Sequence, residues 1–479
     1  MPSVSLTFAS LLATGPAPGE DRVLEAGAVR EGATGTRASF SQLANPGGLS
    51  AAAKLLTGLK AGDIAGKPEP ATVLRRLLKF CASGQLVVYD GSVFASFLEA
   101  EALNPPASLE ALRLARIVRP QATDYSLEAI AEGLGLEFEA AHRALPRARL
   151  LRQVWFALLN ELAKLPPAAL DVICRIAEAA RDPLAPVLAE AAARRGDFEL
   201  SADAEQELAE LFTDHRDLFQ RAQKYEGAEP GDEPLPTDAI CRMFTRTGIV
   251  GRRLPQYEQR AEQVEMVRAV CEALNEPHHL TVEAGTGTGK SMAYLMPAIA
   301  WSCTNDDKVL VSTNTKNLQE QLYRKDLPFL TTLLPGRFEP ALLKGRRNYL
   351  CVRRFMHMMR HFERELAGPD EFQALLPLVA WAARTESGDL AECNGFLLSP
   401  AAPSVAQTVV TGPDECAGRA CRFRSRCFVH RARALAQLAD LIVVNHALLF
   451  AELGLDSRVL PPYRCVVFDE AHNLEDVAT

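Results

Sequence analysis

The stretch HHLTVEAGTGTGKSMAYLMPAIAW, residues 278–301, decides the fold of the second half of the chain. A β-rich run ends at Glu283, and an apolar run with helical character follows Lys290. Between them lies AGTGTGKS, residues 284–291, with alternating glycines. Glycines let the backbone curl so that successive N–H groups face inward and, with the amino end of the next helix, form an anion cradle. The stretch therefore predicts a strand, a phosphate-binding loop and a helix.

The loop is close to the pattern G-x-x-x-x-G-K-[ST], in which the lysine reaches the β- and γ-phosphates and the hydroxyl binds Mg²⁺. Lys290 and Ser291 take these two positions, and Ala284 replaces the first glycine. A glycine-rich turn without a ligand is the alternative, which the flanking strand and helix disfavour. We expect these residues to bind ATP: Ala284, Gly285, Thr286, Gly287, Thr288, Gly289, Lys290 and Ser291.

A second motif, CVVFDEAH at residues 465–472, places two carboxylates after an apolar strand. Ligands of open α/β sheets bind at the carboxyl ends of the strands. Asp469 is therefore expected to hold Mg²⁺ through water, and Glu470 to orient or deprotonate the attacking water. A solvated acidic strand end is the alternative. Other ATPases share a strand followed by Asp-Glu, but His472 completes the D-E-A-H form typical of helicases, and we count it with Lys290 among the catalytic candidates.

Together these motifs resemble superfamily 2 DNA helicases, in particular the DinG/XPD iron–sulfur branch. LPQYEQRAEQVEM (254–266) is similar to the family's Q motif, which implies that Arg260 and Gln263 meet the adenine. KVLVSTNTKNLQEQL (308–322) resembles motif Ia, which implies a DNA contact at Thr313. DLIVVNHALL (440–449) is similar to the strand ahead of the DEAH box. The resemblance covers residues 245–479 and implies ATP-dependent 5′–3′ movement on single-stranded DNA in repair or replication.

Four of the eleven cysteines are spaced unlike core residues. Cys351 stands alone, and Cys416, Cys421 and Cys427 follow as C-x4-C-x5-C. Zinc sites usually show C-x2–4-C pairs, whereas each iron of a [4Fe–4S] cluster takes one cysteine. The spacing resembles the DinG iron–sulfur insert, so we expect a [4Fe–4S] cluster, with zinc or free structural thiols as alternatives. Cys393 lies between them and is not expected to be a ligand.

Positive charge gathers around these cysteines although the net charge of the chain is −8. Any basic surface that binds nucleic acid must therefore be local. Arg422, Arg424 and Arg426 are the arginines we expect to contact the DNA backbone, with the rings of Tyr349, Phe423 and Phe428 as stacking faces. A solvated charged surface is the alternative.

The first domain resembles the DEDD-type 3′–5′ exonuclease domain that precedes some DinG-like helicases. Its motifs fall on RVLEAGAVREG (22–32) and HRALPRARLL (142–151). That chemistry uses four acidic residues to hold two metal ions. The acidic positions fall instead on Ser10, Leu12, Phe94 and Arg147, and only the histidine, His142, matches.

Neither an arginine nor a phenylalanine ligates Mg²⁺, so we predict a nuclease-shaped domain without nuclease activity. It would position DNA or a partner, or stabilise the chain. Asp90 and Glu110 lie nearby in sequence, but two misplaced acids do not rebuild a two-metal site.

The domain prediction follows from these motifs and from composition. With 48% hydrophobic and 23% charged residues, the 479-residue chain is an ordinary globular α/β protein of several domains. We expect an RNase H-like exonuclease-type domain over 1–165, in which three successive strands (3–11, 22–29 and 37–46) belong to a mixed sheet. A helical connector and acidic linker follow over 166–240, and a P-loop RecA-like helicase domain over 241–479 carries an iron–sulfur insert over 345–435. No apolar run reaches the ~20 residues of a membrane span, so we expect a cytoplasmic protein without a membrane partner.

The resemblance also implies a second RecA-like lobe, which would follow the DEAH box. We therefore expect either a longer gene product or a separate chain that supplies this lobe, and negligible coupled unwinding by the present chain alone. Two rival functions remain open at this point: a non-catalytic DNA-binding or regulatory protein with relic ATP and cluster sites, and an exonuclease with an ATPase regulator.

Overall fold

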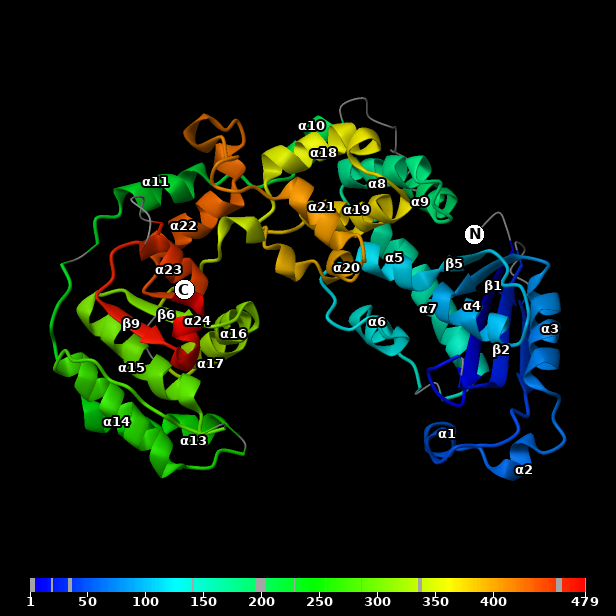
Figure 1. Ribbon diagram of the computed structural model, residues 1–479, viewed down its shortest axis with the longest axis horizontal. Helices are drawn as coiled ribbons and strands as arrows, with labels where there is room; N and C mark the ends of the chain where they lie inside the picture. The colour runs from blue at the N-terminus through cyan, green and yellow to red at the C-terminus, as the bar shows by residue number, and fades with distance from the viewer. Residues whose placement is uncertain are drawn as a thin grey trace. The chain divides into compact units, whose positions relative to one another are not determined.

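The computed structural model describes residues 5–18, 20–32, 37–139, 142–193, 204–227, 229–254, 256–285, 287–334, 338–453 and 459–478. The chain divides into two compact units (Figure 1). Unit 1 comprises Met1–Phe212, Arg354–Glu386 and Leu390–Val409, and unit 2 comprises Thr213–Arg353, Ser387–Asp389 and Val410–Thr479. This division differs from the predicted linear boundaries, because the chain leaves unit 2 after Arg353 and returns to it twice.

Unit 1 is organised around a mixed sheet in the order β3-β2-β1-β4-β5. Strands β1, β2 and β3 form an antiparallel meander, whereas β4 and β5 run parallel to β1. The strands are β1 (Leu6–Ala13), β2 (Val23–Glu31), β3 (Arg37–Leu43), β4 (Gln85–Val88) and β5 (Ser108–Glu110). The three successive strands and the mixed sheet predicted for this region are confirmed.

Helices α3 and α7 both pack against β2, which buries most of this strand (Figure 1). The start of α7 approaches so closely that a Cβ atom at Gly27 would lie 2.4 Å from the backbone carbon of Ala144. The buried carboxylate of Glu25 accepts hydrogen bonds from the Arg143 side chain and from the Ala144 N–H at 3.0 Å. Charge pairing and a side-chain-free glycine thus fix α7 on the sheet.

The remaining helices of unit 1 surround this sheet or extend from it. In the N-terminal segment they are α1 (Ala51–Thr57), α2 (Ala61–Ile64), α3 (Pro70–Cys81), α4 (Gly91–Ala100), α5 (Ala111–Val118), α6 (Leu127–Gly133), α7 (Ala144–Leu162), α8 (Pro167–Ala179), α9 (Ala185–Ala193) and α10 (Ala204–Glu210). From the later segments come α18 (Val352–Glu365), whose first two residues belong to unit 2, α19 (Pro369–Ala382), α20 (Asn394–Leu397) and α21 (Ala402–Val409).

The later helices pack directly on the N-terminal ones. Helix α19 contacts α5 and α8, and α20 contacts α5. The Arg384 guanidinium donates to the Val118 carbonyl at 3.0 Å, and the Gly395 N–H donates to the Pro120 carbonyl at 2.8 Å. The segment predicted as part of a helicase insert is therefore, over residues 354–386 and 390–409, an integral part of the unit that holds the exonuclease-like sheet.

Unit 2 contains a parallel sheet in the order β7-β8-β6-β9. The strands are β6 (Val309–Thr313), β7 (Pro340–Leu342), β8 (Leu441–Asn445) and β9 (Cys465–Phe468). In the sheet register Val311 is level with both Val443 and Val467. The carboxyl ends of β6, β8 and β9 consequently meet at one edge of the sheet.

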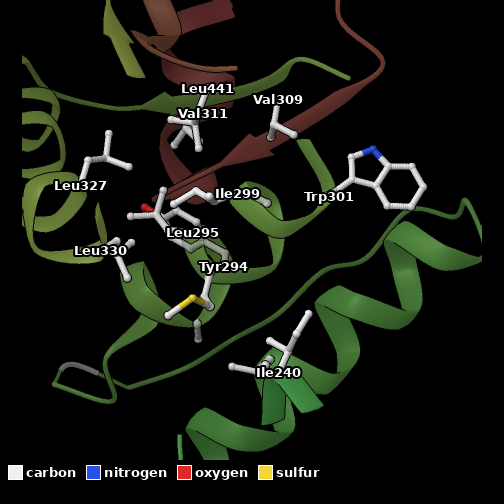
Figure 2. Close-up of a cluster of buried hydrophobic side chains, with 14 of the residues drawn as sticks. Ile240, Tyr294, Leu295, Ile299, Trp301, Val309, Val311, Leu327, Leu330 and Leu441 are labelled. Atoms are coloured by element: carbon white, nitrogen blue, oxygen red, sulfur yellow. The ribbon is translucent and has the colours of Figure 1, made fainter. Parts of the chain in front are cut away.

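Helices flank this sheet, and several of them contribute buried apolar side chains to one core with it. They are α11 (Arg216–Lys224), α12 (Thr237–Met243), α13 (Ile249–Arg253), α14 (Ala261–Asn275), α15 (Lys290–Asn305), α16 (Lys316–Gln321), α17 (Leu327–Thr331), α22 (Phe428–Leu438), α23 (His446–Leu453) and α24 (Leu474–Ala478). Figure 2 shows Leu295 and Ile299 of α15 against Val311 of β6, with Leu327 and Leu330 of α17 beside them. Burial of these side chains anchors α15, and with it the loop that precedes it.

Several predicted elements of unit 2 are confirmed, and one is wrong. The helix after the phosphate loop, the strand and helix around Thr315, and the strands before Asn445 and Asp469 are all present. The strand expected to end at Glu283 is not formed: residues 277–285 have no regular structure. Leu280 and Val282 are 39% and 40% exposed, because within the described sheet no strand pairs with this β-rich run. A strand needs a partner, which the local sequence pattern does not reveal.

No helix in the described parts of the chain is long and apolar enough to span a membrane.

The packing of α20 on α5 generates a stability prediction. A Cβ atom at Gly395 would lie 2.5 Å from the Arg116 carbonyl oxygen, which belongs to rigid helical backbone. We expect Gly395→Ala to destabilise unit 1 by about 1–3 kcal/mol, the usual effect of overpacking. Thermal unfolding of the purified chain measures it. Gly62→Ala is the matched control, since nothing lies within 4 Å of that Cβ position. Equal midpoints for the two variants would contradict this packing.

Candidate nucleotide-binding site

The phosphate loop turns into α15 through two glycines with left-handed backbone. Gly287 and Gly289 both have φ of +80°, a conformation that other residues adopt only with strain. The Thr288 hydroxyl closes the turn by donating to the Gly285 carbonyl at 3.0 Å. The loop therefore has the curled backbone that the sequence predicted. Thr286 lies outside the described residues.

Lys290 and the acidic motif meet at the edge where the strands end. The Lys290 ammonium lies 3.7 Å from a Glu470 carboxylate oxygen and donates to the Ala284 carbonyl at 3.3 Å. The Asp469 N–H donates to the Ser312 carbonyl at 2.8 Å, which continues the β6–β9 ladder by one residue. Glu470 has φ of +56°, rare for a non-glycine residue and common where function demands strain. The structure thus brings together the charged groups that the two motifs predicted.

Ionisation in this site is shaped by burial and by the neighbouring carboxylate. Burial, and next the charge of Glu470, raise the pKa of the Asp469 carboxyl, while the Lys290 ammonium opposes the shift. The charge of Asp469 in turn adds to burial in raising the pKa of Tyr294 well above its usual range. A divalent cation bound here would favour the charged form of the Asp469 carboxyl.

A buried polar pair lies behind the acidic motif. The Ser312 hydroxyl and the His446 Nδ1 are 2.7 Å apart, and His446 is fully buried at the start of α23. Burial lowers the pKa of His446, which favours the neutral ring. His472 is exposed, and its Nδ1 lies 3.5 Å from Glu470. The pair of Ser312 and His446 joins the end of β6 to the start of α23. It lies next to Asp469, whose N–H donates to the Ser312 carbonyl.

A cavity of about 540 Å³ lies beside the phosphate loop. It is lined by Leu254, Gln256, Tyr257, Glu258, Arg260, Gln263, Gly287, Thr288, Gly289 and Met292. Both residues predicted to meet the adenine, Arg260 and Gln263, are among them. Gln256, Tyr257 and Met292 were not singled out from the sequence. Met292 could have been found, because it follows the Lys-Ser pair on the first turn of the helix.

The four cysteines of the predicted cluster all belong to unit 2, and Cys393 belongs to unit 1. Cys351, Cys416, Cys421 and Cys427 are half-buried, whereas Cys393 is fully buried. Burial raises the pKa of the Cys427 thiol, and the charges of Cys351 and Cys416 add to this effect. The Arg346 guanidinium donates to the Cys416 sulfur at 2.9 Å. Across the described ranges, however, no group of three or more His, Cys, Asp or Glu side chains is arranged to hold a metal ion.

The predicted arginines form a loop next to these cysteines, which we call the arginine loop (residues 419–426). Arg422 is exposed and its guanidinium lies 4.7 Å from the centre of the Phe423 ring, while Arg424 and Arg426 are half-buried. The Ser425 carbonyl accepts a hydrogen bond from the His215 N–H at 2.7 Å, which ties the loop to the start of α11. Of the three predicted arginines, Arg422 is thus the most exposed.

Two of the three predicted stacking faces are wrong. Tyr349 is 4% exposed and its hydroxyl accepts a hydrogen bond from the Lys344 N–H at 3.0 Å. Phe428 is 2% exposed and lies against Gly388, where a Cβ atom would be 2.1 Å from its ring. Both rings are core residues, so only Phe423 remains accessible.

Thr313 is also placed differently from its predicted role. Its side chain is fully buried at the end of β6, so in this structure it cannot reach DNA. Two residues later Thr315 is exposed, and its hydroxyl accepts the Leu318 N–H at 3.2 Å to begin α16. The sequence motif located the turn correctly but not the side chain that faces solvent.

In unit 1, two of the residues predicted to stand at the acidic positions of the exonuclease motifs make structural contacts. Phe94, a residue of α4, is buried in the core, and Arg147 forms an ion pair with Glu128 at 3.0 Å. Asp90, a possible substitute, instead caps α4 by accepting the Ser92 N–H at 3.0 Å. Burial raises the pKa of the Glu110 carboxyl. These contacts favour structural roles for Phe94, Arg147 and Asp90.

Comparison with known proteins matches both units. Residues 13–151 match the Exonuclease family, and residues 263–335 match the DEAD/DEAH box helicase family. The chain is 44% identical over 238 residues to the ATP-dependent helicase DinG of Mycobacterium tuberculosis, covering 46% of this chain and 35% of that protein. It is 37% identical over 244 residues to the ATP-dependent DNA helicase YoaA of Haemophilus influenzae, covering 50% of this chain and 37% of that protein.

A third relative spans both units. The chain is 27% identical over 382 residues to the 3′-5′ exonuclease DinG of Bacillus subtilis, covering 78% of this chain and 38% of that protein. The resemblance to DinG-type helicases predicted from the sequence is confirmed. The chain spans well under half the length of these curated relatives.

Proposed function

We propose that this chain is the ATP-binding part of an ATP-dependent DNA helicase of the DinG type, which moves 5′ to 3′ on single-stranded DNA in repair or replication. The observation that carries the proposal is the 3.7 Å approach of Lys290 to Glu470 at the carboxyl edge of a parallel sheet, beside a cavity of about 540 Å³. Ligands bind at this edge in open α/β sheets. The names of the helicase relatives agree with it.

Each charged group has a role in this proposal. The backbone N–H groups of Gly287–Gly289 and the Lys290 ammonium hold the β- and γ-phosphates, which displaces Lys290 from Ala284 and Glu470. Ser291 and Asp469 hold Mg²⁺, which offsets the charge of the phosphates. Glu470 orients or deprotonates the attacking water. His472, whose Nδ1 lies 3.5 Å from Glu470, couples changes at this site to the rest of the helicase.

Base recognition is assigned to residues that line the cavity next to the phosphate loop. Gln263 is 5% exposed, and its amide lines the cavity together with Arg260. A glutamine amide matches the N6 and N7 edge of adenine, as it does in nucleic-acid recognition. We assign Arg260 and Gln263 to the adenine.

The thiol set is suited by its chemistry to an iron–sulfur cluster held by Cys351, Cys416, Cys421 and Cys427. All four are half-buried, and the charges of Cys351 and Cys416 add to the burial that raises the pKa of Cys427. The N–H groups of Arg346 and Gly418 that point at the Cys416 sulfur would stabilise a thiolate ligand. The cluster would order the loops that carry the arginines.

The exonuclease-like part of unit 1 is proposed to be inactive as a nuclease. A phenylalanine in the core and an ion-paired arginine occupy two of the metal-binding positions. A second RecA-like lobe, from a longer product or a separate chain, would complete the motor.

Lys290→Ala tests the ATP site. We expect DNA-stimulated ATP hydrolysis, measured as the release of inorganic phosphate, to fall at least about a hundredfold. An effect of this size is typical when one preorganised donor to a developing charge is removed. Lys325→Ala, an exposed lysine beyond α16, is the control and should retain the parental rate. Parental hydrolysis in Lys290→Ala, or none in the parent with DNA present, would favour the rival proposal of a relic site in a binding protein.

Reversing the charge of Arg422, Arg424 and Arg426 to Glu tests the arginine loop. Single-strand binding should weaken, and the slope of log K against log salt should flatten by ~0.7 for each lost phosphate contact. Fluorescence anisotropy of a labelled oligonucleotide at several salt concentrations measures both. Reversal of Arg75 and Arg76, exposed on α3 of unit 1, is the control. An unchanged slope in the loop variant would remove the loop from the DNA interface.

Metal analysis after anaerobic purification tests the cluster. Iron and acid-labile sulfide should be present in equal amounts and should be lost in Cys421→Ser, because each iron needs one thiolate. Cys393→Ala should keep both, since Cys393 lies in the core of unit 1. Zinc in place of iron, or full iron content in Cys421→Ser, would contradict the assignment.

A further inference from the structure

The imidazole ring of His446 lies among the strand ends that carry the candidate ATP site. His446 is the first residue of α23, directly after β8, and its side chain is fully buried. Its Nδ1 is 2.7 Å from the Ser312 hydroxyl of β6. The centre of its ring is 6.0 Å from that of Phe468, the last residue of β9. The ring thus contacts β6 and β9, while its own backbone continues from β8.

The neighbours of the ring indicate which of its nitrogens carries the hydrogen. Burial lowers the pKa of His446, and the backbone of Asp469 and Glu470 opposes this effect. Carbonyl oxygens act in this way, because they accept a hydrogen bond from a protonated ring nitrogen. Since Ser312 engages Nδ1, the nitrogen left for these carbonyls is Nε2, which is also buried. The neutral ring that fits all of these neighbours accepts at Nδ1 and carries its hydrogen on Nε2.

The turn to which these carbonyls belong is strained. Glu470 has φ of +56° and ψ of +44°, a left-handed conformation that a residue with a side chain keeps only where its surroundings hold it. On one side of Glu470, the Asp469 N–H donates to the Ser312 carbonyl at 2.8 Å. On the other side, the Asn473 N–H donates to the Glu470 carbonyl at 3.1 Å. Ser312 therefore holds the ring with its hydroxyl and the turn with its carbonyl.

We propose that His446 is a positioning residue, which holds the turn after β9 in the conformation that aims the Glu470 carboxylate at the attacking water. The inference rests on the proposed ATP hydrolysis and deepens it. An N–H at Nε2 that faces the carbonyls of the turn favours the left-handed conformation, and the Ser312 hydroxyl fixes the orientation of the ring. Because Glu470 acts on the water and not on the phosphates, loss of the ring slows turnover more than it weakens ATP binding.

Substitutions of His446 in the full chain separate the roles of its two nitrogens. His446→Leu removes both polar contacts and keeps a buried side chain. The amide of glutamine reaches the position of Nε2, whereas that of asparagine reaches only the position of Nδ1. We expect kcat for DNA-stimulated ATP hydrolysis to fall about 10- to 100-fold in His446→Leu and His446→Asn, the effect of a slightly misplaced catalytic group, with the Kd of ATP changed by less than about twofold. His446→Gln should recover most of the parental kcat.

Amide hydrogen exchange reports on the same turn without requiring hydrolysis. The N–H groups of Asp469 and Asn473 should exchange roughly three- to tenfold faster in His446→Leu, the effect of one lost hydrogen bond. Ser302→Ala is the matched control, because its buried hydroxyl donates to the Asp440 carbonyl at 3.0 Å, next to the amino end of β8. It should lower the thermal midpoint and leave both kcat and the exchange of the turn at parental values.

The outcomes separate this inference from the proposed function. Slower turnover with retained ATP affinity in His446→Leu, restored in His446→Gln, would support the inference. Parental kcat in His446→Leu, or a joint loss of kcat and ATP affinity that His446→Gln does not restore, would overturn it. If His446→Leu does not fold, the comparison of His446→Asn with His446→Gln decides in the same way. A parent that does not hydrolyse ATP contradicts the proposed function. Unchanged exchange at Asp469 in His446→Leu then overturns the positioning role, and faster exchange supports it.

Discussion

The ammonium group of Lys290 and the carboxylate of Glu470 come from distant parts of the sequence and lie 3.7 Å apart. The elements of unit 2 that carry them hold the two groups at this distance. Lys290 is brought by a helix that begins directly after a left-handed glycine, and Glu470 by a strand that ends in a strained left-handed turn. Parallel strands in level register supply the common edge. The apolar side chains of α15 and β6 hold the two carriers against each other.

This arrangement joins three parts of one site. Toward the base, the Gln263 amide links the cavity to Gly289. Toward the sheet, the Asp469 backbone bonds to Ser312, whose hydroxyl meets His446 at the end of β8. The acidic motif is therefore hydrogen-bonded to β6 and, through Ser312, to His446. Such contiguous hydrogen-bonded contacts are a physical route by which nucleotide binding can reach residues beyond the site.

Unit 1 differs from unit 2 in the contacts that organise it. Around its sheet, Phe94 is buried in the core and Arg147 is ion-paired with Glu128. The same unit contains helices α19 and α20 from the middle of the helicase region, packed on α5 with a glycine at the closest contact. Packing contacts of this kind depend on shape and apolar area rather than on ionisable groups.

The sequence predicted those features that depend on local pattern. The phosphate loop, the strand before Asp469 and the meander of β1–β3 have signatures that their own residues carry. Features that depend on tertiary partners were missed. Within the described residues, the β-rich run before Glu283 has no pairing strand, and Tyr349 and Phe428 are buried in the core. Periodicity cannot tell which surface a side chain will meet.

The central claim is that Lys290 and Asp469 hold one nucleotide between them, and calorimetric titration of the chain with ATP tests it most directly. With Mg²⁺ present, the account predicts a single saturable site, tighter than without Mg²⁺, and loss of this Mg²⁺-dependent gain in Asp469→Asn. Absence of binding, or a Mg²⁺-dependent gain that Asp469→Asn leaves intact, would contradict the account.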